Sequence, residues 1–272
     1  MDAPNVFTEE KRLTYQSIHA EQDGTTLVLT LHNLEKRNAL TTAMMGELSS
    51  AVGEAGADAA VRAIIITGGP KFFSAGADLN EALAVKSVAD GDAFFGRFHR
   101  LAEVLESCGK PVIAAIEGFC ITGGFELALA CDLRVGAEGS TYAITSSRIG
   151  TVAGFGGTQR LPRLVGPGNA FEILFAAEPI DSDHALRIGL LNRRPAAGQA
   201  LTEAKRMAAV FAERAPLGLA FAKRAVYRGM QMDLASAIEF EFYLVNSIYG
   251  TADKQEGVSA FLEKRKAQFI GR

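Results

Sequence analysis

Two glycine-containing turns in the middle of the chain carry the residue types best suited to chemistry. They are residues 74–78 (SAGAD) and 122–126 (TGGFE), and each precedes an expected helix. The N–H groups in the first turn of a helix have no partner within that helix. Two such turns that converge would therefore form an oxyanion hole for a carbonyl that becomes an enolate. Small residues suit this role, because the substrate must approach the backbone itself.

Glu126 follows the second glycine pair, within the first turn of its helix. There it could act as a general base or acid beside the bound carbonyl. The alternative interpretation is structural: both segments are packing turns, and Glu126 is a carboxylate that the positive end of the helix dipole favours. Residue type and spacing leave both interpretations open.

The elements that would position these turns alternate between strand and helix, which predicts an α/β fold. Strands are expected at residues 15–21, 25–32, 62–67, 112–116 and 133–135, the first two forming a hairpin that turns at Gly24. Helices are expected at 41–56, from about 79, at 91–107, at 123–131 and from about 158. The continuous β-branched run at 62–67 indicates a strand that is buried on both faces.

After residue 168 the sequence becomes almost wholly helical. Helices are expected at 169–177, 181–188, 198–213, 215–229, 233–249 and 252–266, with one short strand at 190–193. We interpret residues 1–195 as a core that holds the site. Residues 196–272 would form a C-terminal helical region that is not an independent domain.

Composition excludes several classes of protein. The chain has 272 residues, of which 48% are hydrophobic and 22% charged, as in soluble globular proteins. With a net charge of −3 and no basic stripe, nucleic-acid binding is not expected. No apolar run approaches ~18 residues, so no membrane-spanning helix is expected. Residues 1–12 lack the basic and apolar regions of a signal peptide.

Cysteine and histidine usage points to a reduced protein without a metal. Cys108, Cys120 and Cys131 are odd in number and lie in apolar segments, which predicts buried thiols in a cytoplasmic protein. The four histidines are scattered, and no Cys/His spacing fits a zinc site.

Three short motifs fail when they are tested position by position. Residues 118–125 outline a phosphate-binding loop, but they lack its lysine and its serine or threonine. Residues 154–157 begin like a dinucleotide fingerprint, without the third glycine or the later acidic residue. Residues 72–76 resemble a nucleophile elbow, with Phe72 in place of the first glycine.

Four segments, in order and in spacing, resemble the crotonase family of enoyl-CoA hydratases and isomerases. They are KFFSAGADLNEA (71–82), KPVIAAIEGFCITGGFELALACD (110–132), GFGGTQRLPRLVG (154–166) and EGVSAFLEKRKAQF (256–269). The resemblance runs from about Leu34 to Phe269. It implies a spiral of ββα units with a C-terminal helical region that builds trimers, often paired into hexamers. It also implies a coenzyme A thioester as substrate, with no separate cofactor and no metal.

The resemblance also implies roles for particular residues. By motif position, the oxyanion hole would be the backbone N–H groups of Ala77 and Gly123, and Gly76 and Gly124 would let backbone approach the thioester. Residues matching segments that line the coenzyme A path are Lys36, Arg37, Ala75, Asp78 and Leu79. Phe261 and Lys264 match positions that approach the adenine and phosphate end of coenzyme A, usually from a neighbouring subunit.

The sequence departs from the family pattern at its second catalytic glutamate. Typical hydratases use two glutamates; the first is present as Glu126, whereas the second aligns with Ser146, and a usual proline aligns with Ala153. A hydroxyl cannot replace a carboxylate as base without activation, but it can hold a water or a substrate oxygen.

Several further residues carry both a functional and a structural interpretation. His99 is either a titrating residue of the pocket or a structural or surface histidine, and Tyr249 matches a region where some relatives bring a tyrosine to the substrate. Thr122 replaces the first glycine of a common GGG and would narrow the site or simply fill its turn. Arg148 would face coenzyme A or a subunit interface. Three phenylalanines would shape the acyl pocket: Phe94, Phe95 and Phe98.

Hydration of a 2-enoyl-CoA is the expected reaction, because Glu126 and both turns are retained. The alternatives are another crotonase-type reaction on a coenzyme A thioester (isomerisation, decarboxylation or hydrolysis) or a protein that binds acyl-CoA without chemistry. The replacement at Ser146 keeps these alternatives open.

Overall fold

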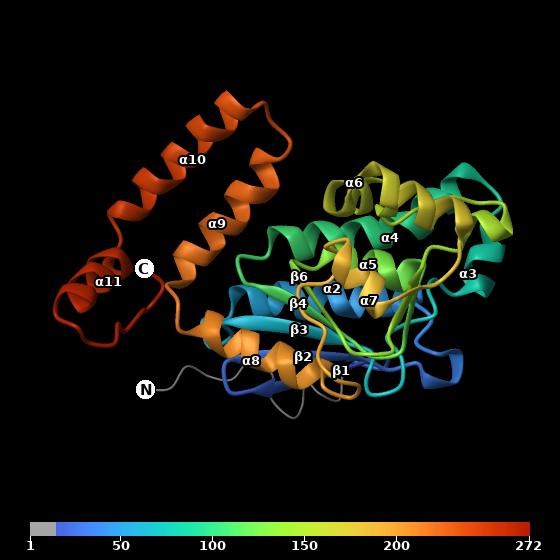
Figure 1. The fold of residues 1–272 in the computed structure, drawn as a ribbon, viewed down its shortest axis with the longest axis horizontal. Coiled ribbons are helices and arrows are strands. Elements are labelled where there is room, and N and C mark those ends of the chain that lie inside the picture. Colours follow the sequence, from blue (N-terminus) through green and yellow to red (C-terminus); the bar gives the residue numbers. More distant parts are fainter. Residues whose placement is uncertain (1–14) are drawn as a thin grey trace.

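A five-stranded sheet forms the centre of the computed structural model, which describes residues 15–272 (Figure 1). Its strand order is β1-β2-β3-β4-β6, with β1 (Ile18–Asp23) and β2 (Thr26–Leu31) antiparallel and the remaining pairs parallel. This confirms the hairpin, whose turn includes Gly24 at a φ of +58°. Residues 1–12, where no signal peptide is expected, lie outside the described residues.

Both faces of this sheet are buried. In β3 (Ala63–Thr67) every residue is buried, with Ile64 and Ile66 packing on one side and Ile65 on the other. The helices on the first side include α2 (Thr42–Ala57), α4 (Val88–Ser107) and α5 (Gly123–Ala130), and α8 (Ala200–Ala212) covers the second side. The α/β class is therefore confirmed, as is the strand buried on both faces.

A second sheet of three short strands was not expected from the sequence. It consists of β5 (Phe119–Ile121), β7 (Thr141–Ala143) and β8 (Ile180–Asp181). Two strands of the central sheet pass into this layer before a helix follows: β4 (Val112–Ile116) leads to β5 and α5. In the same way β6 (Leu133–Gly136) leads to β7, the 3-10 helix η2 (Ser146–Ile149) and α6 (Gly157–Ala176). The chain therefore repeats a ββα unit.

The strand expected at residues 190–193 is wrong. Only an isolated bridge between Val135 and Arg193 forms there, while Leu190 and Leu191 are buried in the main core. Two backbone hydrogen bonds still join this segment to β6, from Asn192 N to Arg134 O and from Gly136 N to Arg193 O. The apolar character of Leu190 and Leu191 reflects their packing in the core.

Capping residues set the helix starts. Thr41 Oγ1 accepts a hydrogen bond from Met44 N at 3.1 Å and begins α2, as expected. Helix α4 begins earlier than expected because Ser87 and Asp90 form a capping box. Helix α6 is kinked at Gly166, whose φ is +80°.

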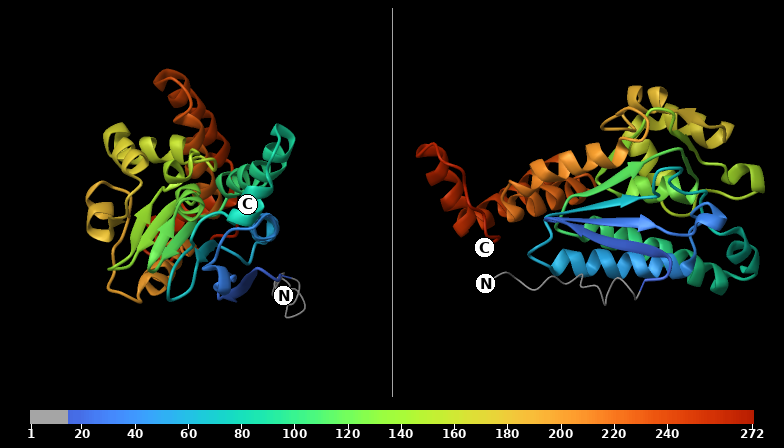
Figure 2. Two further views of the ribbon diagram at one scale, coloured as in Figure 1. Left: turned by 90° about the vertical axis from the view of Figure 1, so that its right-hand side faces the viewer. Right: turned by 90° about the horizontal axis from the view of Figure 1, so that it is seen from below.

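The C-terminal helices extend away from the sheets (Figures 1 and 2). They are α9 (Pro216–Gly229), α10 (Leu234–Tyr249) and α11 (Ala252–Leu262), and they follow α7 (Ser182–Arg187) and α8 in the chain. Because α8 packs on the central sheet, the helical arm proper begins with α9; the division of the chain at residue 195 stays a prediction. No helix within residues 15–272 has the length and apolar character needed to cross a membrane.

A partly buried polar cluster fixes this arm to the core. Lys223 Nζ on α9 lies 2.8 Å from Asp132 Oδ2, and Tyr227 donates to Asp132 Oδ1 at 2.9 Å. Lys223 also donates to the carbonyl oxygens of Leu105 and Lys110. The base of α9 is therefore positioned by directional contacts as well as by apolar packing.

Candidate active site

The two glycine-containing turns meet in the structure. Ser74 pairs with Cys120 in a parallel bridge, which brings the turn before α3 (Leu79–Ala84) against the turn before α5. A Cβ atom added to Gly123 would lie 3.0 Å from Ala77 N. Neither the N–H of Ala77 nor that of Gly123 donates a hydrogen bond to another described residue. Two free backbone donors therefore lie side by side, as an oxyanion hole requires.

Small residues make this approach possible. Gly76 has a φ of +103°, and a Cβ added there would lie 3.1 Å from Ile121 O. A Cβ added to Gly124 would lie 2.6 Å from Ser74 Cβ, so the first residues of α5 can contact the opposite turn only as glycine. Ser74 is fully buried, and its hydroxyl donates to Asn38 O at 2.7 Å and accepts from Gly76 N at 3.1 Å.

Thr122 is held in a conformation that disfavours a side chain. Its φ and ψ are 43° and −108°, in the positive-φ region that usually selects glycine. Its Oγ1 accepts from Thr145 N at 3.0 Å and lies 2.9 Å from Thr145 Oγ1, while its N–H donates to Ala143 O at 2.7 Å. These bonds tie the residue before Gly123 to the segment that carries Ser146.

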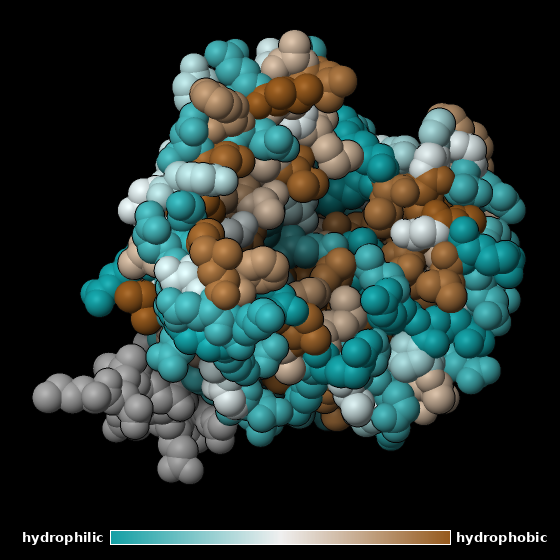
Figure 3. Space-filling view, turned by 60° about the vertical axis from the view of Figure 1, so that its left-hand side comes forward, coloured by the Kyte–Doolittle hydropathy of each residue, from teal (hydrophilic) through white to brown (hydrophobic). Residues whose placement is uncertain are grey.

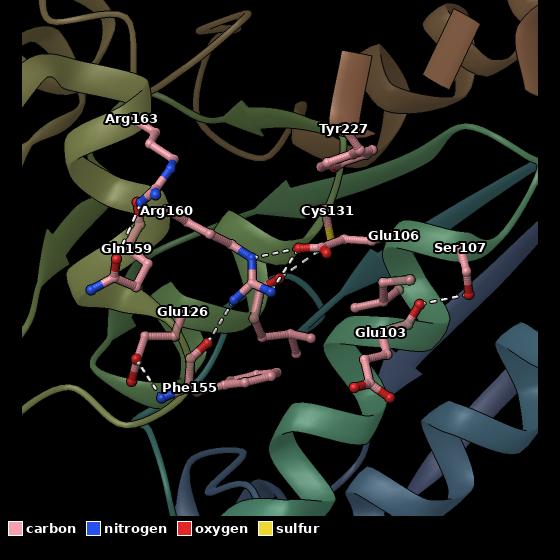
Figure 4. Close-up of polar contacts among 12 residues, drawn as sticks. Glu103, Glu106, Ser107, Glu126, Cys131, Phe155, Gln159, Arg160, Arg163 and Tyr227 are labelled. Carbon is pink, nitrogen blue, oxygen red and sulfur yellow. Dashed lines mark hydrogen bonds and ion pairs between the residues drawn. The ribbon is translucent and has the colours of Figure 1, made fainter. Parts of the chain in front are cut away.

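Glu126 is buried and is held by two backbone N–H groups. Its side chain is 3% exposed, and Oε1 accepts from Phe155 N at 2.7 Å and from Gly157 N at 2.8 Å; Figure 4 shows the first of these bonds. Its Oε2 makes no hydrogen bond to another described residue. One carboxylate oxygen is therefore fixed, and the other is available to a water or a substrate proton.

The pKa of Glu126 is raised to about 6, chiefly by burial. The two backbone donors oppose this rise of the pKa, as do the electrostatic interactions with Arg160 and His99. A carboxyl group with this pKa is mostly ionised at neutral pH yet basic enough to take a proton, which suits a general base.

Ser146 begins η2 close to this site. It is 5% exposed, and its hydroxyl makes no hydrogen bond to another described residue. The preceding residue, Thr145, is the one that bonds to Thr122, so Ser146 lies near the start of α5. Ala153 is also buried, and a Cβ added to Gly157 would lie 3.0 Å from its Cβ and 2.9 Å from Glu126 Oε1.

The residues expected along the coenzyme A path lie beside the turn at residues 74–78, and we call this part of the surface the rim of the site. Lys36 Nζ lies 2.6 Å from Asp78 Oδ2, and the buried Asp78 also caps α3 through the N–H of Asn80. Arg37 has a φ of 53°, and its carbonyl accepts from Ala75 N at 3.0 Å. The side chains of Arg37, Ala75 and Leu79 are exposed there.

The C-terminal candidates lie far from the turns within one chain. Phe261 is 83% exposed on α11, and Lys264 follows that helix with a φ of 56°. In Figure 1 α11 lies at the far end of the helical arm from α3. A contact between these residues and a coenzyme A molecule therefore requires the arm of another chain.

The remaining candidates make structural contacts. His99 Nε2 lies 2.9 Å from Gly154 O, Arg148 pairs with Glu178, and Tyr249 packs under Lys254 Nζ, which lies 4.7 Å from the centre of its ring. Phe94 and Phe98 are buried in the main core. Phe95 packs so closely on Gly154 that an added Cβ would lie 2.6 Å from its ring.

Sequence reasoning missed the turn that holds Glu126. Residues 154–157 supply both N–H donors to its carboxylate, and Arg160 binds the carbonyl of the same turn. The signal was the group of glycines at Gly154, Gly156 and Gly157, which contributed to the family resemblance but to which we assigned no role at Glu126.

Comparison with known proteins places this geometry in a family. Residues 21–272 match the family model described as enoyl-CoA hydratase/isomerase. The chain belongs to the enoyl-CoA hydratase/isomerase family. It is 40% identical to a probable enoyl-CoA hydratase of Bacillus subtilis over 90% of this chain and 95% of that protein. It is 39% identical to a crotonyl-CoA hydratase of Syntrophomonas wolfei over 96% of this chain and 100% of that protein.

Solved structures agree with these matches. The crystal structure of an enoyl-CoA hydratase from Bacillus anthracis superposes with a TM-score of 0.90 at 32% identity, covering 94% of this chain and 100% of that one. The crotonase-like spiral of ββα units with a C-terminal helical region is therefore confirmed. The family is one of enzymes, and the relatives from Bacillus subtilis and Syntrophomonas wolfei are named as hydratases.

Proposed function

We propose that this chain hydrates a 2-enoyl-CoA thioester. The observation that supports this best is the pair of free N–H groups at Ala77 and Gly123, followed one helical turn later by the buried Glu126. Relatives that cover nearly the whole chain are named as enoyl-CoA hydratases, which supports the same reaction.

In this mechanism the thioester oxygen accepts hydrogen bonds from the N–H groups of Ala77 and Gly123. Glu126 Oε2 takes a proton from a water, whose oxygen bonds to the β-carbon while the π electrons move toward the thioester and form an enolate. The enolate then takes the proton back from Glu126 at the α-carbon, so that one carboxyl group balances both transfers. Each oxyanion-hole donor contributes on the order of 10²–10³ in rate.

The resemblance to the family implies that Ser146 takes the place of a second glutamate. Its hydroxyl would donate to, or accept from, the attacking water without removing a proton. This assigns all proton transfer to Glu126 and predicts a slower hydratase than one with two carboxylates, since a general acid–base group contributes about 10²–10⁴.

Coenzyme A would enter as part of the substrate, with no separate cofactor and no metal. Its pantetheine and nucleotide would run along the rim formed by Lys36, Arg37, Ala75, Asp78 and Leu79. The exposed Arg37 and the outer face of the Lys36–Asp78 pair offer charge for the phosphates. Phe261 and Lys264 would complete this end of the site from a neighbouring copy.

A homotrimer, or a dimer of trimers, would bring these residues together. None of the residues of α9 is buried, and Leu244 is the only buried residue of α10. Exposed apolar side chains on α10 include Leu234, Ile238, Phe242 and Tyr249. Figure 3 shows apolar side chains gathered on the face where the C-terminal helices come forward. Contiguous apolar surface of this kind marks a protein interface. The three buried, unpaired thiols suit the reducing cytoplasm.

The experiment is an assay of the purified protein with crotonyl-CoA, followed by loss of the enoyl absorbance. Glu126→Gln should lower kcat by about 10²–10⁴ while calorimetric binding of the saturated butyryl-CoA stays nearly unchanged. Glu103→Gln is the matched control, because Glu103 is an exposed carboxylate on α4. Equal activity of wild type and Glu126→Gln would overturn the assignment.

A second candidate is another reaction of a coenzyme A thioester at the same pair of N–H groups. The observation that favours it is a serine, not a carboxylate, at position 146. Isomerisation, decarboxylation and thioester hydrolysis all develop negative charge on the same oxygen, and none requires two carboxylates to activate a water. Tight binding of butyryl-CoA without turnover of crotonyl-CoA would favour this candidate or a non-catalytic acyl-CoA-binding protein. Product analysis with 3-enoyl-CoA and malonyl-type thioesters then separates these two.

A further inference from the structure

The turn that holds Glu126 is itself held by an arginine. Arg160 Nη1 donates to Phe155 O at 3.0 Å, on the residue whose N–H donates to Glu126 Oε1 (Figure 4). The same residue, Phe155, therefore receives a bond from Arg160 and gives one to Glu126. A movement of Arg160 would move the donor that fixes the carboxylate.

Arg160 is oriented in turn by Glu106 on α4. Its Nε lies 2.7 Å and its Nη2 2.6 Å from Glu106 Oε1. Both side chains are only partly exposed, at 25% for Arg160 and 32% for Glu106. Three of the guanidinium nitrogens are thus used by two partners, a geometry that lysine cannot reproduce.

The backbone of the turn leaves space for this guanidinium. Gly156 has a φ of +93°, and a Cβ added there would lie 1.9 Å from Arg160 Nη1. Gly157 must lack a Cβ for a different reason, because that atom would lie 2.9 Å from Glu126 Oε1. One glycine makes room for the arginine and the next makes room for the glutamate, on either side of one short segment.

A second contact from α4 holds the start of the same turn. His99 Nε2 lies 2.9 Å from Gly154 O. His99 and Glu106 are seven residues apart, so they lie on the same face of α4, two helical turns from each other. The turn is therefore fixed to α4 at Gly154 through His99 and at Phe155 through Arg160 and Glu106.

The charges around Glu126 agree with this geometry. Arg160 on α6 and His99 on α4 are the charged or titratable groups that lower its pKa, against the larger effect of burial. Glu106 lies behind Arg160 and partly balances its charge.

We propose that Arg160, oriented by Glu106, is a positioning residue that sets both the direction and the basicity of the Glu126 carboxylate through the turn at residues 154–157. This rests on the proposed role of Glu126 in proton transfer. Removing Arg160 takes away a positive charge and loosens the N–H donors of Phe155 and Gly157, and both changes favour the protonated form of Glu126. The pKa of Glu126 then rises further above about 6.

The test compares Arg160→Met with Arg163→Met, a matched control on the same helix. Arg163 is exposed and, among residues 15–272, its side chain bonds to Gln159 alone, so its loss removes the same charge from α6 without touching the turn. In Arg160→Met the acidic limb of the kcat profile should move about one pH unit upward, which lowers kcat about fivefold at pH 6. A residual loss of up to about 10²-fold at pH 9 would report misdirection of the carboxylate. Arg163→Met should keep the wild-type profile.

Two more variants separate positioning from general damage to the fold. Glu106→Gln keeps an acceptor for Arg160 and should shift the limb less than Glu106→Leu does. Arg160→Lys keeps the positive charge but loses the several N–H donors of the guanidinium group. Compared with Arg160→Met, it should bring the pKa of Glu126 part of the way back to the wild-type value and recover little of kcat at pH 9. Thermal unfolding of each variant identifies any that fail to fold. An unchanged pH limb in a folded Arg160→Met protein would overturn the proposal.

A measurement that needs no turnover distinguishes this inference from the proposed function. The Glu126 carboxyl can be titrated by NMR of protein labelled with ¹³C at glutamate Cδ, using Glu126→Gln to assign the signal. A higher pKa of Glu126 in Arg160→Met supports the clamp, by which we mean Arg160, Glu106 and the turn at residues 154–157. It does so even if no variant hydrates crotonyl-CoA. Equal pKa values would overturn the clamp even if the wild type is an active hydratase.

Discussion

Lys36 Nζ and Asp78 Oδ2 lie 2.6 Å apart, so two residues expected separately on the coenzyme A path are partners of each other. Asp78 is 2% exposed, whereas Lys36 reaches solvent with half of its side chain. The same carboxylate caps α3, and the N–H of Asp78 donates to Leu40 O. The pair therefore connects the loop at Lys36 to the turn that carries Ala77.

Loss of the Asp78 carboxylate should destabilise the protein. Asp78→Ala removes a helix cap and an ion-pair partner, and a cap alone contributes about 1 kcal/mol. Lys36→Met should cost less, because Lys36 is half exposed and the Asp78 carboxylate keeps the N–H donors of Asn80 and Glu81. Lys36 holds the pKa of Asp78 below its usual value, so this stability is present above the unfolded pKa and is lost as pH falls through the lower folded one. Urea denaturation at pH 7 and at low pH measures both effects. Equal stability of Asp78→Ala and wild type at pH 7 would contradict the capping role.

Burial of Glu126 should lower the stability of the folded protein while it provides a more basic carboxylate for catalysis. Because its folded pKa of about 6 exceeds the ordinary 4.5, the ionised form is disfavoured in the folded state. The free-energy cost of burying the ionised Glu126 carboxylate is absent below pH 4.5 and grows as pH rises to about 6. Above that pH it stays at about 2 kcal/mol. Glu126→Gln should therefore unfold at higher temperature than wild type at pH 8, with little difference at pH 4. Calorimetry checks this, with Glu103→Gln as control. A Glu126→Gln protein that is less stable at pH 8 would mean that the two N–H bonds outweigh burial.

The pattern of the sequence predicted the parts of this fold that are long or strongly apolar. The turns at residues 74–78 and 122–126 were found because each joins a run of strand residues to a helical run. Strands β5, β7 and β8 were missed, since two or three residues are too few to show a period. Residues 190–193 were misassigned because Leu190 and Leu191 are apolar for packing against the core.

The same limit applies to the site. Glu126 could be found because it follows the glycines of its own helix. The clamp that holds Glu126 could not be predicted from the sequence, because Arg160 bonds to Glu106, which is 54 residues away. Its other bond is to the backbone carbonyl of Phe155, and residue type does not indicate a backbone contact. The pairing of Lys36 with Asp78 spans 42 residues and likewise depends on the folded chain.

Gly123 should be intolerant of a single added methyl group. In Gly123→Ala the new Cβ would lie 3.0 Å from Ala77 N, in the space between the two free N–H groups. We expect kcat with crotonyl-CoA to fall on the order of 10²–10³, the value of one oxyanion-hole donor. Gly53→Ala is the control: nothing lies within 4 Å of its added Cβ on α2, and it should stabilise the helix by up to about 1 kcal/mol. If Gly123→Ala keeps wild-type kcat, the hole lies elsewhere.

Ser146 provides the sharpest test of single-carboxylate chemistry. Because its hydroxyl has no bond to another described residue, Ser146→Ala should change the free energy of unfolding by less than about 1 kcal/mol. Any loss of kcat in Ser146→Ala would then report a bond to water or substrate. Ser146→Glu introduces a second carboxylate at a 5% exposed position near Glu126, so the pKa of the new carboxyl group should be raised by burial and by the like charge.

If hydration is limited by the single carboxylate, Ser146→Glu should raise kcat with crotonyl-CoA, up to the ~10²–10⁴ of a general acid–base group. Ser146→Gln is the control, because it adds the same volume without the proton-transfer group. A gain in kcat in Ser146→Glu that Ser146→Gln does not share would mean that the wild-type rate is limited because Glu126 is its single catalytic carboxylate. A folded Ser146→Glu protein with no gain, beside an active wild type, would mean that Glu126 carries both proton transfers without a second carboxylate.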